Sequence, residues 1–203
     1  MGSRPIEASE IGRAVATIAG AFASDPVWEP ALRRRDGRTD HHEPYWRLYV
    51  EGAMRFGTVR TSDDGGAVSV WLPPGEAELS DEQAADLTGL LRRTLDPPDV
   101  DAIEALYGRF EASRAGRPAH AYLSLLATHP DHRGRGVGQR LLADDLDVWD
   151  AQRLPTYLES TNPVNDHRYA RAGFQADGGF RAVRDDAWIS AMWRPIGGVP
   201  SGD

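Results

Sequence analysis

The sequence predicts one domain of the mixed α/β (α+β) class, spanning residues 1–203 and built on a single sheet flanked by helices. Three observations support this class. Helical and strand-like apolar patterns alternate along the chain. A buried strand near residue 125 runs through a glycine-rich turn into an amphipathic helix, as in α/β units. No internal repeat occurs, and no linker is long enough to separate two domains.

The composition excludes several classes of protein. The chain has a formal net charge of −8, and all 23 of its basic residues are arginine. The acidic balance disfavours nucleic-acid binding, and the lack of lysine excludes Walker-type phosphate binding and Schiff-base catalysis. The lack of cysteine excludes disulfides and thiolate chemistry. No apolar run reaches the ~20 residues of a membrane span, and no leader pattern opens the chain. We therefore expect a cytoplasmic protein with no membrane or nucleic-acid partner, as a monomer or homodimer.

The first half is expected to hold four helices and one hairpin. In order, the expected elements are helices at 11–22 and 43–55, strands at 56–61 and 67–72, and helices at 84–91 and 100–110. Asp63-Asp64-Gly65-Gly66 has the composition of a hairpin turn. Ser80 followed three residues later by Gln83 predicts a capping box at the start of the third helix.

The second half is expected to alternate strands and helices. The expected elements are a strand at 120–128, a helix through Trp149, a strand at 156–160, a short helix at 164–172 and two closing strands. Residues 188–193 are apolar on both faces of the last strand, which is typical of a central strand in a sheet.

The most informative stretch is the glycine-rich turn. Gly134, Gly136 and Gly138 alternate between the strand and the next helix, flanked by arginines. Glycines let a ligand approach the backbone, and free N–H groups at a helix start favour phosphate. A Rossmann fingerprint needs the spacing G-x-G-x-x-G, which this turn lacks. A turn that only connects strand and helix remains the alternative.

Two motifs carry a resemblance to a known family. Arg133-Gly134-Arg135-Gly136-Val137-Gly138, after the strand and His129-Pro130, resembles the coenzyme A loop of the GNAT superfamily of N-acetyltransferases. Residues 157–174 follow with Leu-Glu at a strand end, an Asn-rich turn and Tyr-x-x-x-Gly-Phe. This sequence pattern is especially similar to that of the branch that includes puromycin N-acetyltransferase. Asp166-His167-Arg168 departs from the apolar residues usual before the Tyr.

The resemblance implies a more detailed fold and an acetyl-CoA co-substrate. The sheet would be twisted, mostly antiparallel and splayed at the central coenzyme-binding strand. Residues 1–118 would supply mainly acceptor-side helices and the hairpin, residues 119–195 the coenzyme-binding and catalytic half, and residues 196–203 a tail. The reaction implied is transfer of acetyl from acetyl-CoA to a primary amine of a small molecule by direct attack.

The resemblance also assigns coenzyme-binding positions. The pyrophosphate would lie on the loop formed by Arg133, Gly134, Arg135, Gly136, Val137, Gly138 and Gln139. Backbone groups of Leu126, Ala127 and Thr128 would pair with the pantetheine arm and polarise the acetyl carbonyl. Asn162 and Asn165 either bind pantetheine or cap the short helix.

The catalytic candidates are Tyr169 and Glu159. A phenol is protonated at neutral pH and can protonate the coenzyme A thiolate, although Tyr169 alternatively only packs against Phe174. Glu159 at a strand end is a candidate general base, and alternatively an ammonium anchor or a surface acid. His120 and His167 are other candidates for the base.

Two further hypotheses concern substrate and metal. Trp71, beside a Pro-Pro turn, is a weak candidate for an aromatic acceptor pocket, since a Trp in an apolar strand usually belongs to the core. His129 and His132 have no third ligand nearby, so we expect no metal.

Two alternatives to the small-molecule acetyltransferase stay open. One is a catalytically silent acyl-CoA-binding module. The other is a protein or peptide N-acetyltransferase, which would have an open groove in place of a closed pocket.

Overall fold

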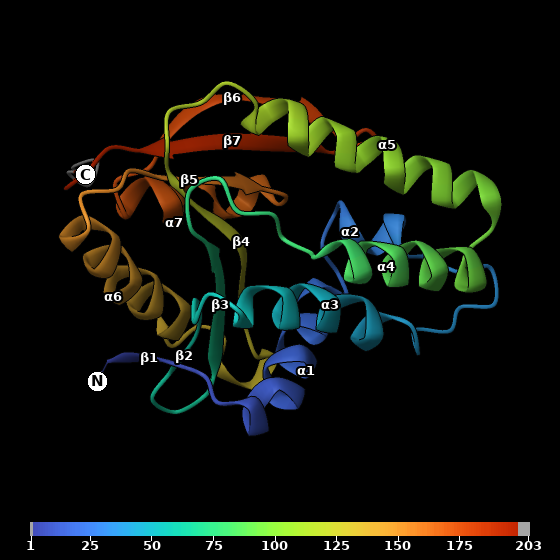
Figure 1. Cartoon of the computed structure of the whole chain (residues 1–203), viewed down its shortest axis with the longest axis horizontal. Helices are drawn as coiled ribbons and strands as arrows, with labels where there is room; N and C mark the ends of the chain where they lie inside the picture. The colour runs from blue at the N-terminus through green and yellow to red at the C-terminus, as the bar shows by residue number, and fades with distance from the viewer. Residues whose placement is uncertain (1, 199–203) are drawn as a thin grey trace.

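The computed structural model describes residues 2–198 and contains one seven-stranded sheet in the order β1-β2-β3-β4-β5-β7-β6 (Figure 1). Its strands are β1 (Ser3–Pro5), β2 (Val59–Ser62), β3 (Ala67–Leu72), β4 (Ala121–Thr128), β5 (Thr156–Ser160), β6 (Gln175–Arg181) and β7 (Trp188–Arg194). Neighbouring strands are antiparallel except β4 and β5, which are parallel. The predicted mixed, mostly antiparallel class is confirmed. Of the predicted tail, residues 199–203 lie outside the described residues.

The helices divide between the two faces of the sheet. They are α1 (Ile11–Phe22), α2 (Trp28–Ala31), α3 (His42–Met54), α4 (Asp81–Thr94), α5 (Pro97–Arg114), α6 (Val137–Ala151) and α7 (Asp166–Arg171), with 3-10 turns η1 (Ala8–Glu10), η2 (Pro130–His132) and η3 (Pro163–Asn165). In one core cluster, the five helices from α1 through α5 pack on the sheet face that carries Val68 and Tyr122. A second joins α6 with the face of Trp71 and Leu158. Figure 1 shows α5 and α6 well separated across the sheet. Among the described helices, none is long and apolar enough to cross a bilayer.

Local sequence signals account for most element boundaries. The Ser80–Gln83 capping box begins α4, with Gln83 N–H donating to Ser80 Oγ at 3.2 Å. β7 lies between β5 and β6, as its two apolar faces predict. β2 begins at Val59 rather than residue 56, because a turn with Gly57 at a φ of 68° precedes it. The short helix predicted at 164–172 is η3 followed by α7.

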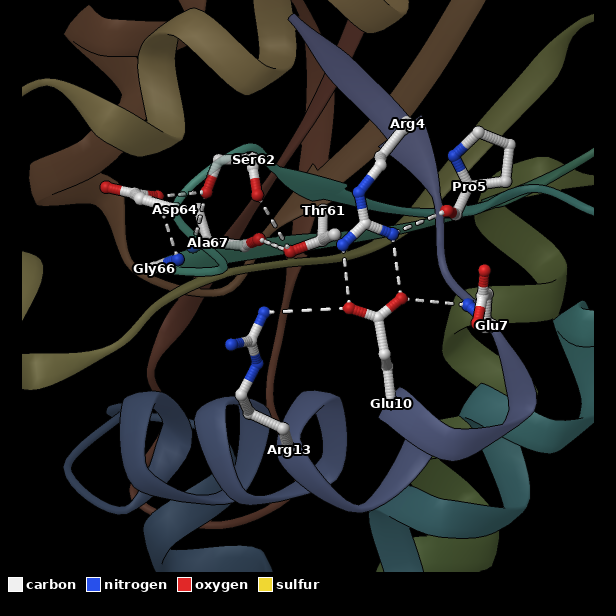
Figure 2. Close-up of polar contacts among 10 residues, drawn as sticks. All are labelled: Arg4, Pro5, Glu7, Glu10, Arg13, Thr61, Ser62, Asp64, Gly66 and Ala67. Carbon is white, nitrogen blue, oxygen red and sulfur yellow. Dashed lines mark hydrogen bonds and ion pairs between the residues drawn. The ribbon is translucent and has the colours of Figure 1, made fainter. Parts of the chain in front are cut away.

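Polar contacts hold the edge strand β1 and the hairpin turn (Figure 2). Both terminal guanidinium nitrogens of Arg4 donate to Glu10 at 2.7 Å, and Glu10 also accepts from the backbone N–H of Glu7 at 3.0 Å. In the turn, Asp64 Oδ1 accepts from Ser62 Oγ at 2.7 Å and from Gly66 N–H at 2.9 Å. The short strand β1 carries no strong local signal, and its contacts with β2 are long-range: the antiparallel pairing itself and the hydrogen bonds from Arg60 Nη2 to the Ser3 carbonyl and hydroxyl oxygens.

Strands β4 and β5 separate in the middle of the sheet. Their pairing covers only residues 121–123 with 156–158, whereas β4 continues to Thr128. An irregular register between Val70 and Trp71 of β3 gives β4 an extra residue opposite it, which is a β-bulge that bends the strand. From Ser124 onward β5 offers β4 no pairing partner. The predicted splay of the central strand is therefore present.

Candidate active site

The glycine turn forms a cradle at the start of α6. Gly134 and Gly136 have φ values of 76° and 69°, a left-handed region that favours glycine. The first helical bond runs from Arg140 N–H to the Gly136 carbonyl at 3.0 Å. The N–H groups of the first turn therefore have no helical acceptor, and the positive end of the helix dipole adds to them. This arrangement suits an anion such as a diphosphate.

A groove of about 500 Å³ lies over this cradle. Most of the predicted coenzyme-binding positions border it: Leu126, Thr128, Arg133, Gly134, Gly136, Val137, Gly138, Gln139, Asn162 and Asn165. Arg135 does not border it; its carbonyl accepts a hydrogen bond from Arg140 Nη1 at 2.8 Å. Ala127 is 2% exposed and its side chain lies in the core, so its backbone alone remains available for the predicted role.

A second cavity, of about 840 Å³, lies between the sheet and α4 and α5. Its wall combines aromatic and apolar side chains with charged groups. The charged and imidazole side chains are Asp25, Glu76, Glu78, Glu104, Glu111, Arg114, Arg117, His120 and Glu159. Carboxyl groups outnumber guanidinium groups in this wall, so the cavity favours a cationic guest.

The groove and the cavity share six lining residues: Phe22, Asp25, Leu126, Asn162, Asn165 and Tyr169. We call this set the junction. It lies next to the point where β4 leaves β5. A ligand on the cradle and one in the cavity would therefore meet beside Tyr169.

Tyr169 on α7 is half-buried at the junction. Burial raises the pKa of its phenol to about 12, with further increases from the charges of Asp25 and Asp166 and an opposing effect of Arg168. Its ring also packs against Phe174, with ring centroids 6.1 Å apart. The phenol is therefore protonated at neutral pH, and packing and an acid role are compatible.

Glu159 on β5 lines the cavity. Burial raises the pKa of its carboxyl to about 7, against the opposing influence of Arg114 and of the Tyr122 and Tyr157 hydroxyls. Both carboxylate oxygens are buried, and within residues 2–198 neither has a hydrogen-bond partner of good geometry. A carboxyl group in this state changes protonation near neutral pH, as a general base does.

Both asparagines reach the site, but only Asn162 caps a helical turn with its side chain. Asn162 Oδ1 accepts from Val164 N–H at 3.2 Å, and Asn165 Oδ1 accepts from Arg168 Nη1 at 2.9 Å. Both border the groove and the cavity. Capping is thus shown for Asn162, and contact with a pantetheine arm stays a prediction.

The expected placement of Trp71 at an acceptor pocket needs correction. Its side chain is 0% exposed, borders neither cavity, and donates from Nε1 to Asp145 Oδ2 at 2.9 Å. The side chain points to the α6 face of the sheet, because residues alternate along β3 and the cavity lies on the other face. Trp71 therefore belongs to the core.

The histidines are placed differently from one another. His120 lines the cavity, and burial lowers the pKa of its imidazole. His167 is exposed and borders neither cavity. His129 Nδ1 accepts from Asp131 N–H at 3.2 Å, and His132 Nδ1 lies 3.4 Å from Asp64 Oδ2.

Asp25 borders the site although the sequence motifs give it no functional role. The structure places it at the junction with 8% exposure. The sequence shows an acidic residue shortly after an amphipathic helix. It does not show that this residue is buried, which is what places it at the site.

The parallel strands β4 and β5 that separate, and the glycine turn at the start of α6, give the chain the architecture of a GNAT fold. Residues 100–176 match the family model described as acetyltransferase (GNAT) domain. This segment of the chain is therefore similar to GNAT acetyltransferase domains, a group of enzymes that use acetyl-CoA.

Known proteins share this sequence pattern and fold at low identity. An uncharacterized N-acetyltransferase of Schizosaccharomyces pombe is 24% identical over 202 residues, which is 92% of this chain and 79% of the relative. A Corynebacterium glutamicum protein described as histone acetyltransferase HPA2 and related acetyltransferase is 22% identical, with a TM-score of 0.59 and coverage of 100% and 99%.

Two insect structures have the same fold. The Drosophila melanogaster polyamine N-acetyltransferase, which forms N-acetylagmatine, is 14% identical, with a TM-score of 0.66 and coverage of 96% and 99%. A putative arylalkylamine N-acetyltransferase of the yellow fever mosquito is 13% identical, with a TM-score of 0.68 and coverage of 96% and 86%.

Proposed function

We propose that the protein transfers an acetyl group from acetyl-CoA to a primary amine of a small molecule. The observation that carries this proposal is the junction, where an 840 Å³ cavity and the coenzyme groove share Tyr169. A cavity of this size accommodates a small ligand. The similarity of residues 157–174 to the puromycin N-acetyltransferase branch supports a small acceptor, and so do the amine acetyltransferases among the proteins of the same fold.

The charge of the cavity favours an amine that arrives as a cation. Glu78, Glu104 and Glu111 line it, together with Asp25 and Glu159. Ser124 Oγ donates a hydrogen bond to Glu78 Oε1 at 2.5 Å, and Arg114 Nη2 lies 3.7 Å from Glu78 Oε2. The negative charge of Glu78 is therefore already partly compensated. The remaining carboxyl groups attract ammonium groups and repel anionic acceptors.

The cradle and β4 would hold the thioester. The loop 133–139 binds the diphosphate through backbone N–H groups, and arginine side chains add positive charge. Backbone groups of Leu126, Ala127 and Thr128, left unpaired by β5, bind the pantetheine arm. One of their N–H groups donates to the acetyl carbonyl oxygen and stabilises the negative charge that develops there.

The acyl transfer itself is a direct attack. The neutral amine nitrogen forms a bond to the carbonyl carbon, the carbon–sulfur bond breaks, and the thiolate takes the phenol proton of Tyr169. After attack the nitrogen loses a second proton, which restores the phenol of Tyr169, whereas the first proton, lost by the ammonium group before attack, goes to Glu159. Because the Glu159 oxygens are buried, this proton travels through a water molecule or after the side chain turns toward the cavity. The lack of cysteine removes the commonest acyl-enzyme nucleophile.

The domain assignment stays part of the proposal. One sheet receives strands from both halves of the chain, and the junction takes residues from both, so residues 1–203 act as a single unit. No part of the site is expected to work alone.

The test is release of coenzyme A thiol from acetyl-CoA in the presence of a panel of amines. We expect amine-dependent thiol release with small cationic amines and acetylation of the amine detected by mass spectrometry. A coenzyme-binding module would show acetyl-CoA-dependent melting but no turnover. A protein acetyltransferase would acetylate peptides and leave small amines unchanged. Either result would overturn the proposal.

A further inference from the structure

Asp25 joins two segments of the chain at the junction. It follows α1, is 8% exposed and borders both the groove and the cavity. Its Oδ1 accepts from the backbone N–H of Val27 at 2.9 Å and of Trp28 at 3.1 Å. Its Oδ2 accepts from Thr161 Oγ1, 136 residues later, at 2.8 Å. One buried carboxylate therefore connects the α1–α2 loop to the turn after β5.

The segment held by Thr161 leads directly to Tyr169. Asn162, the next residue, caps η3 with its side chain, and η3 continues into α7. Any movement of Thr161 is passed along this short, continuous segment to the phenol. The Asp25–Thr161 bond thus lies at the start of the segment that ends in Tyr169.

Capping the start of α2 does not by itself require a buried carboxylate with a third hydrogen-bond donor. Asn and Ser cap helix starts as well as Asp does, and burial of a carboxylate is costly unless several donors compensate it. Burial raises the pKa of the Asp25 carboxyl, and the hydrogen bonds from Thr161, Val27 and Trp28 oppose this increase. The third donor, Thr161, has no part in capping α2. The bond to Thr161 therefore indicates a second role.

We propose that Asp25 is a positioning residue for acyl transfer, which holds the Thr161–Tyr169 segment so that the phenol faces the junction. The proposal rests on the function proposed above, in which Tyr169 protonates the thiolate. The three hydrogen bonds of the Asp25 carboxylate go to Val27, Trp28 and Thr161, and none of these residues belongs to the loop 133–139. Its loss therefore affects the transfer step and leaves the pyrophosphate contacts of that loop in place.

The experiment compares three variants in the full chain. Asp25→Ala and Thr161→Val each remove the bond, and we expect kcat to fall at least tenfold while KM for acetyl-CoA stays within threefold. In Asp25→Asn the amide oxygen can still accept from the backbone N–H groups of Val27 and Trp28, and the amide N–H can donate to Thr161 Oγ1. Because the link to Thr161 is kept, we expect at least a third of the wild-type kcat. The double variant Asp25→Ala/Thr161→Val should be no slower than Asp25→Ala, because both remove one interaction.

A matched control is Asp36→Ala. Asp36 Oδ1 accepts from Arg38 N–H at 3.0 Å in an exposed turn away from both cavities, so its loss should leave kcat unchanged. A purely structural role of Asp25 would lower the melting temperature without changing kcat per folded molecule. If Asp25→Ala does not fold, Thr161→Val and Asp25→Asn still give the answer.

The results separate this inference from the proposed function. Wild-type kcat in Thr161→Val would overturn the positioning role. Equal losses in Asp25→Asn and Asp25→Ala would also overturn it and assign the role to the carboxylate charge. The proposed function itself fails if the wild-type protein acetylates no amine, or if Tyr169→Phe retains full turnover.

Discussion

Gly138 in the first turn of α6 lies against Thr128 at the end of β4, so closely that a Cβ on Gly138 would be 2.5 Å from Thr128 Oγ1. Gly138 has no positive φ, unlike Gly134 and Gly136. Its requirement is therefore close packing of helix on strand. Both residues also border the groove over the cradle.

Gly138→Ala should therefore weaken coenzyme binding. The added methyl must displace Thr128 or α6, and overpacking of this kind typically costs about 1–3 kcal/mol. We expect the Kd for acetyl-CoA, measured by calorimetry, to rise about tenfold. Adding Thr128→Ala should restore part of the affinity by making room.

Gly12→Ala is the matched control. Gly12 is exposed in α1, and a Cβ at this position would have open space within 4 Å. Ala in a helix stabilises by about 0.5–1 kcal/mol over Gly. The substitution should leave the Kd unchanged. An unchanged Kd in Gly138→Ala would mean that the cradle tolerates a wider gap.

Tyr169→Phe should slow the transfer step. General acid catalysis typically contributes about 10²–10⁴-fold, so kcat should fall by at least two orders of magnitude with the Kd for acetyl-CoA within threefold. Because burial raises the phenol pKa to about 12, wild-type kcat should show no loss from this proton below about pH 11. Full turnover in Tyr169→Phe would remove the phenol from the mechanism.

Glu159→Gln should change the pH profile of activity. With a pKa of about 7, the Glu159 carboxyl gains its proton as pH falls and can no longer accept one from the amine. The wild-type kcat/KM should therefore decline below about pH 7. In Glu159→Gln, kcat/KM should be lower at all pH values and should not show this decline below pH 7. Amines of different pKa separate the effect of Glu159 from the ionisation of the amine itself.

The same substitution should alter stability in a pH-dependent way. The folded-state pKa of Glu159 is raised from 4.5 to about 7, so the folded state favours the protonated form. Folding stability is then lost as pH rises from about 4.5 to about 7, by about 3 kcal/mol in total. Glu159→Gln should be about as stable as wild type at pH 4.5 and more stable at pH 8, measured by urea unfolding. Equal stability at both values would show that the carboxyl is solvated.

Asp145→Asn should destabilise the fold. Asp145 on α6 is 0% exposed and accepts from Arg60 Nε at 2.8 Å, Ser69 Oγ at 2.5 Å and Trp71 Nε1 at 2.9 Å. Breaking a buried ion pair from one side leaves the other charge uncompensated and costs about 3 kcal/mol. The measurement is the free energy of unfolding in urea.

Asp147→Asn, exposed on the same helix, provides the comparison. It should change stability by less than about 0.5 kcal/mol. A loss below about 1 kcal/mol in Asp145→Asn would show that its hydrogen bonds to the strands contribute little to the attachment of α6.

Local patterns were sufficient for much of the architecture. The Ser80–Gln83 capping box, the turn at residues 63–66 and the two apolar faces of β7 act through neighbouring residues, so their structures follow from short stretches of sequence. The glycine turn at the start of α6 also follows from a short stretch of sequence, because its positive φ angles depend on the glycines in the turn itself. The edge strand β1 escaped prediction because three residues carry too little pattern.

The sequence by itself determined the order of the strands from β2 to β7 and of the longer helices, the glycine turn at the start of α6 and the position of Tyr169 on a short helix after β5. Only the tertiary structure decided that Asp25 reaches Thr161, that Trp71 faces Asp145 and not the cavity, and that the Glu159 oxygens are buried. The physical reason is that hydrogen bonding and turn geometry are set by adjacent residues. Burial, and with it the pKa of a carboxyl group, depends on which distant segments pack against it.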